Sequence, residues 1–139
     1  MDEKSLHTLE LERVLERLAA HASFSASRER LLAMRPASDI ETADRLLDET
    51  SQARLLLDRH SEISVGGARD IRPNAEDAAR GIPLQPDVLI TVRATLLSAR
   101  SIRRSLGRIA DEVPDLNRIA ARMEDCPGLI DAIGRTISD

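Results

Sequence analysis

The chain has 139 residues, a formal net charge of -4 and a single cysteine. A chain of this length can bury a sizeable core without metals or disulfides, so we expect one domain over residues 1–139. No apolar run approaches the roughly twenty residues of a membrane span, and one Phe without Trp or Tyr cannot form the aromatic platform on which readers of single-stranded nucleic acid stack bases.

The first helices are predicted by apolar spacing and by proline. Residues 9–22 form an amphipathic pattern with mixed charges on the outer face and an apolar stripe of Leu11, Val14, Leu15 and Leu18. A second, short helix is expected to be capped by Ser25 or Ser27. It has to end before Pro36, which lacks an amide donor and disfavours helical angles at the residue before it.

A long third helix is predicted over residues 39–60. Ser38 followed by Glu41 matches a capping box, and Asp39 adds a negative charge where the helix dipole favours one. We expect this helix to pack on its neighbours through Ile40, Ala43, Leu47, Thr50, Ala53 and Leu57, widened by Leu46 and Leu56.

The second half of the chain is divided by glycine and proline. Alternation at Ile63 and Val65 leads into a turn at Gly66 and Gly67, where we expect unusual backbone angles. A short helix follows Pro73 and ends at Gly81, and a long one begins at Pro86. Two more are expected over 115–123 and 128–137, so the sequence predicts an all-α fold of about seven helices.

The helix over residues 86–109 has the most distinctive charge pattern. Its apolar stripe, chiefly Val92, Leu96, Ala99, Ile102 and Leu106, predicts a central packing helix. No acid lies between Asp87 and Asp111, and five arginines do: Arg93, Arg100, Arg103, Arg104 and Arg108. They either contact nucleic-acid phosphates or pair with acidic neighbours such as Asp44, Asp48 and Asp58 of the long third helix, and we favour the pairing.

Signatures of catalysis are absent from the sequence. It has no G-x-x-x-x-G-K-[ST] phosphate loop and no G-x-S-x-G elbow. His7, His21 and His60 lack metal-ligand spacing, and we expect a structural or surface role for each. Cys126 is expected to be a packing residue. We therefore assign this chain no catalytic residue, no metal site and no cofactor.

Several segments together resemble the N-terminus of the bacterial type-two MutS paralogues. The resemblance follows the chain in order through TLELERVLERLAAHAS, the Arg35-Pro36 break, the Ser38-Asp39 cap, QARLLL, VGGARDIRP and PDVLITVRATLLSARSIRRSL. The glycine-rich turn is the most specific of these segments. The resemblance implies a helical segment of a MutS-like core domain at the N-terminus of a longer protein, whose lever, clamp, ATPase and Smr nuclease domains lie outside this chain.

The resemblance also implies a function for that longer protein. Members of the family are ATPases and endonucleases that use ATP and magnesium and act on DNA, where they suppress homologous recombination, or on collided ribosomes. For this chain the resemblance implies a non-catalytic core module, a cytoplasmic location and no contact with membranes. Apolar faces that lack their later partners predict a homodimer. The alternative is an independent helical protein-protein interaction module.

Overall fold

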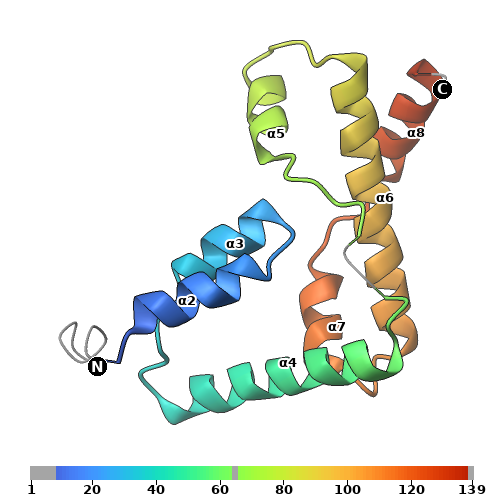
Figure 1. The fold of residues 1–139 in the computed structure, drawn as a ribbon. Coiled ribbons are helices and arrows are strands. Elements are labelled where there is room, and N and C mark those ends of the chain that lie inside the picture. Colours follow the sequence, from blue (N-terminus) through green and yellow to red (C-terminus); the bar gives the residue numbers. More distant parts are fainter. Residues whose placement is uncertain (1–8, 64–65, 138–139) are drawn as a thin grey trace. The chain divides into compact units, whose positions relative to one another are not determined.

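The computed structural model describes residues 9–63 and 66–137, and within them the chain forms seven helices and no strand (Figure 1). The predicted all-α fold is confirmed. The chain divides into two compact units at the Leu47–Asp48 boundary, so each is described by itself. The expectation of one domain stays a prediction. No helix of the described part is long and apolar enough to cross a bilayer.

Unit 1 contains helix α2 (Leu11–Ala20), helix α3 (Ser25–Leu32) and the start of α4 (Ile40–Arg59). Helices α2 and α3 pack side by side, and Leu15 and Ala19 of α2 are buried (Figure 1). The predicted serine cap of α3 is wrong. The helix begins at Ser25 itself and is preceded by Phe24, with no side-chain cap.

The start of α4 differs from the predicted capping box. The amide of Thr42 donates a hydrogen bond to Oδ1 of Asp39 at 2.8 Å, so Asp39 and not Ser38 caps this helix. The residue immediately before the helix is the one whose side chain can reach the third helical amide. That hydrogen bond holds the pKa of the Asp39 carboxyl below its ordinary value, because it stabilises the charged form.

Unit 2 contains the rest of α4 and four further helices: α5 (Arg72–Ala79), α6 (Pro86–Arg108), α7 (Pro114–Ala121) and α8 (Pro127–Thr136). Each of these four begins with proline at its first or second position, where the missing amide donor costs nothing. Gly67 and Gly81 have φ angles of 86° and 78°, as the predicted turn and helix end require. Val65 lies outside the described residues.

The core of unit 2 lies where α6, α7 and the connection between them meet. Leu106, Val113 and Ala120 are buried there, and they are surrounded by half-buried Leu55, Leu56, Ile63, Ile102, Ile109 and Leu116. The predicted stripe of α6 is therefore confirmed at Ile102 and Leu106. The predicted stripe of α4 is wrong in part, because Ile40, Leu47 and Leu57 are 76%, 63% and 69% exposed.

A glutamine of α4 links that helix to the start of α7. Oε1 of Gln52 accepts hydrogen bonds from the amides of Asp115 and Leu116 at 2.8 and 3.3 Å, and its Nε2 donates to Oδ2 of Asp115 at 2.6 Å. The residue before α7 is Val113, whose side chain cannot cap a helix. Gln52 therefore supplies, from a distant part of the sequence, the acceptor that the N-terminus of α7 needs.

Candidate nucleic-acid interface

The five predicted arginines all lie on α6, but their side chains do different things. Arg93 and Arg103 hydrogen-bond to backbone carbonyls: Nε of Arg93 donates to Ile130 at 3.3 Å, and Nη1 of Arg103 donates to Met123 at 3.0 Å. These carbonyls belong to α8 and to the segment that follows α7. Both arginines therefore hold other parts of unit 2 against α6.

The contact between α6 and α8 is close. A Cβ placed on Gly134 would lie 3.0 Å from Nε and 3.2 Å from Nη2 of Arg93. Glycine at this position lets the guanidinium group approach α8 closely, where it reaches the Ile130 carbonyl. The position of Arg93 is thus fixed by packing as well as by its hydrogen bond.

Arg100 has a partner that the sequence did not suggest. Its Nε lies 3.3 Å from Oδ1 of Asp125, in the segment between α7 and α8. This Nε is buried and makes no hydrogen bond to the described residues, so its contact with Asp125 is an ion pair defined by distance alone. The prediction that Asp48 or Asp58 would pair with the arginines of α6 is wrong for the described part of unit 2, and Asp44 belongs to unit 1.

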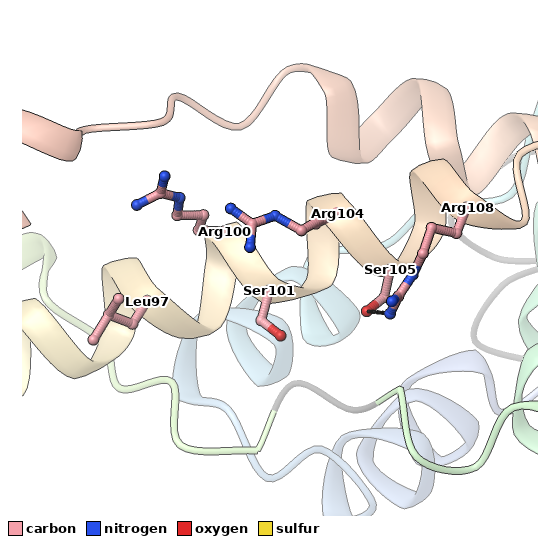
Figure 2. Close-up of a pocket in the computed structure, with 6 residues that line it drawn as sticks. All are labelled: Leu97, Arg100, Ser101, Arg104, Ser105 and Arg108. Carbon is pink, nitrogen blue, oxygen red and sulfur yellow. Dashed lines mark hydrogen bonds between the residues drawn. The ribbon is translucent and has the colours of Figure 1, made fainter.

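The remaining two arginines lie on the outer face of α6. Nη2 of Arg108 donates to Oγ of Ser105 at 3.1 Å, and Arg104 has no hydrogen bond or ion pair within the described residues. Both side chains are exposed. A hollow of about 580 Å³ runs along this face and is lined by Leu97, Arg100, Ser101, Arg104, Ser105 and Arg108 (Figure 2).

The two polar members of this lining other than arginine were missed from the sequence. Arg100, Arg104 and Arg108 follow i, i+4 spacing and form one ridge along α6. Ser101 and Ser105 have the same spacing and follow Arg100 and Arg104 directly in the chain. Figure 2 shows the hydroxyl of Ser105 meeting the guanidinium of Arg108. The face therefore offers hydrogen-bond donors of two kinds.

Among the residues that the structure describes, the other candidates form no second site. His60 lies 3.6 Å from Glu62 and 3.4 Å from Glu112, a surface contact of the kind expected. Cys126 is a half-buried free thiol that precedes α8. No three His, Cys, Asp or Glu side chains of residues 9–63 and 66–137 are placed to share a metal ion. His7 lies outside the described residues.

Comparison with known proteins identifies the chain. It is 37% identical over 142 aligned residues to the endonuclease MutS2 of Geobacillus kaustophilus, and the match covers 100% of the chain. The corresponding protein of Thermomicrobium roseum is 34% identical over 99% of the chain. The chain is a MutS2-like segment. The predicted family resemblance is therefore confirmed.

The MutS2-like segment matches only a small part of these relatives. It spans 18% of the G. kaustophilus protein and 16% of the MutS2 endonuclease of Pelotomaculum thermopropionicum, to which it is 35% identical over 93% of its length. No family model and no solved structure matches it. The name endonuclease thus belongs to proteins more than five times longer than this segment.

Proposed function

We propose that this segment is a non-catalytic core module of a MutS-type DNA-processing ATPase. The observation that carries the proposal is the unequal coverage: proteins named endonuclease MutS2 match the whole segment with less than a fifth of their own length. A module of this size has room for a helical scaffold. The ATP, magnesium and nuclease chemistry of the longer protein would then lie elsewhere in its chain.

The internal contacts of unit 2 suit a module that transmits movement. Helix α6 has 23 residues, and its two halves contact different helices. Its N-terminal half is joined to α8 through Arg93, and its C-terminal half is joined to α7 through Leu106. A rigid helix held at both ends can pass a displacement from one neighbouring helix to the other. A module that links the nucleotide state of an ATPase domain to DNA binding needs this property.

The longer protein is proposed to act in the cytoplasm, on DNA during homologous recombination or on collided ribosomes. Reading the coding sequence that follows Asp139 tests the proposal. We expect an in-frame continuation that contains a G-x-x-x-x-G-K-[ST] phosphate loop, which is the element that holds nucleotide phosphates and magnesium. A stop codon directly after Asp139 would contradict the proposal.

The exposed apolar side chains of α4 favour a second candidate, an independent helical interaction module. Leu47 and Leu57 are more than 60% exposed, although they belong to the longest apolar stripe of this helix. In a longer protein, later helices would cover them. In an independent module, a partner protein or a second copy of the chain would do so, which is also the basis for proposing a homodimer.

A further inference from the structure

The outer face of α6 carries positive charge that the fold does not neutralise. Three of the six side chains that line the hollow are arginines and none is acidic. The ion pair with Asp125 accounts for Arg100 alone. Arg104 and Arg108 stand one turn apart, and neither has a carboxylate partner in the described part of the chain. Because both side chains are exposed and positively charged, an anion that reached both would be stabilised.

The five arginines thus separate into two groups. Arg93, Arg100 and Arg103 hold the segments around α7 and α8 against α6. Arg104 and Arg108 are exposed and contribute no contact between helices. A structural role therefore explains the first group and leaves the second unexplained.

The donors of this face match a phosphate backbone. A guanidinium group presents several N–H donors in a planar fork that fits phosphate oxygens, and serine hydroxyls also donate to phosphate. The ridge from Arg100 to Arg108 is about 12 Å long at 1.5 Å per residue. One strand of a duplex lying alongside presents three to four phosphates over that length, at 3.4 Å of axis per phosphate.

We infer that Arg104 and Arg108, with the hydroxyls of Ser101 and Ser105 beside them, bind the phosphates of a DNA duplex that lies along α6. The choice of DNA rests on the proposed function. The choice of duplex rests on the lining of the hollow, which has no aromatic side chain on which an unpaired base could stack. Such a contact would be independent of sequence, because phosphates carry no base identity.

Duplex binding by the full 139-residue chain, measured against salt concentration, tests the inference. The probe is a fluorescent 20-base-pair DNA, and the observable is the slope of the logarithm of the binding constant against the logarithm of the salt concentration. Each phosphate contact contributes about 0.9 to that slope. We expect Arg104→Gln/Arg108→Gln to lower its magnitude by about 1.8 without changing the thermal unfolding midpoint, since both side chains are exposed.

A matched control separates local contacts from net charge. Arg80 and Arg118 are exposed arginines of the same unit, each in an ion pair with an aspartate three residues earlier. Arg80→Gln/Arg118→Gln also removes two positive charges, and we expect it to leave the slope of the salt dependence unchanged.

Three results would overturn the inference. They are a slope near zero for the unmodified chain, equal slopes for the two double variants, and binding of a polyglutamate peptide in place of the duplex. None of them bears on the proposed function, because a core module need not touch DNA itself. The phosphate-loop sequence sought downstream of Asp139 tests that function separately.

Discussion

Replacing Gln52 by alanine tests whether α7 is capped by a residue of another helix. The substitution removes the acceptor of the Asp115 and Leu116 amides and the donor to the Asp115 carboxylate. Loss of a helix N-cap costs about 1 kcal/mol, and loss of a further side-chain hydrogen bond costs about another 1 kcal/mol. We therefore expect the unfolding free energy of the unit that contains α7 to fall by about 2 kcal/mol.

Urea unfolding followed by circular dichroism measures this loss. For a chain of this size the dependence of the free energy on urea is about 1.5 to 2 kcal/mol per molar, so the midpoint should fall by about 1 M. Gln85→Ala is the matched control, because Gln85 directly precedes α6 but its side chain makes no cap hydrogen bond. If Gln52→Ala and Gln85→Ala unfold at the same urea concentration, Gln52 does not cap α7 and the account of unit 2 fails.

Three further predictions concern other parts of the chain. Asp39→Ala should lower the helix content of the chain at pH 7. Since the folded-state pKa of Asp39 is depressed, its contribution is present above the ordinary carboxyl pKa and is lost as the pH falls through the folded value. Gly107→Ala should stabilise the chain by about 1 kcal/mol in thermal unfolding, whereas Gly134→Ala should stabilise it less or destabilise it, because only the second added Cβ meets a neighbour. Light scattering should show self-association that weakens in Leu47→Gln/Leu57→Gln.

Control variants and contradicting results can be named for each of these three predictions. Ser38→Ala should leave the helix content unchanged, and an equal loss in Ser38→Ala and Asp39→Ala would restore the predicted capping box. Equal gains from the two glycine substitutions would contradict the close packing of α8 on Arg93. Light scattering that shows only a monomer at high protein concentration would contradict the proposed homodimer.

The sequence predicted the helices well because their ends are marked by residues with strong local preferences. Pro73 and Pro86 fix the starts of α5 and α6, and Gly81 marks the end of α5. These preferences act through the backbone of one or two residues, so they can be read without knowing the fold. The mistaken serine caps show the limit, since a shift of one residue changes which side chain reaches the free amides.

Packing partners were harder to predict because they depend on which faces meet. The apolar stripe of α4 predicted burial of Leu47, Leu56 and Leu57, and of these Leu56 contacts the core whereas Leu47 and Leu57 are exposed. Leu55, which was not in the predicted stripe, also contacts the core. Gln52 gave no sequence signal, because a glutamine that caps a helix more than 60 residues away looks like any surface glutamine.

The arginines of α6 show the same limit at the candidate site. Arg100, Arg104 and Arg108 follow i, i+4 spacing and so lie along one side of the helix, but spacing alone does not show which arginines are already engaged. Their division depends on Asp125 and on the Ile130 and Met123 carbonyls, which lie 20 to 37 residues away in the chain. Only the folded structure shows which guanidinium groups remain for a ligand.

The size of the protein that cells make from this gene tests the central claim most directly. An antibody raised against the 139-residue chain should detect a protein five to six times its 15.3 kDa mass, since the chain spans 18% of relatives that match it from end to end. A band at 15 kDa alone would contradict the claim that this segment is a module of a MutS-type protein.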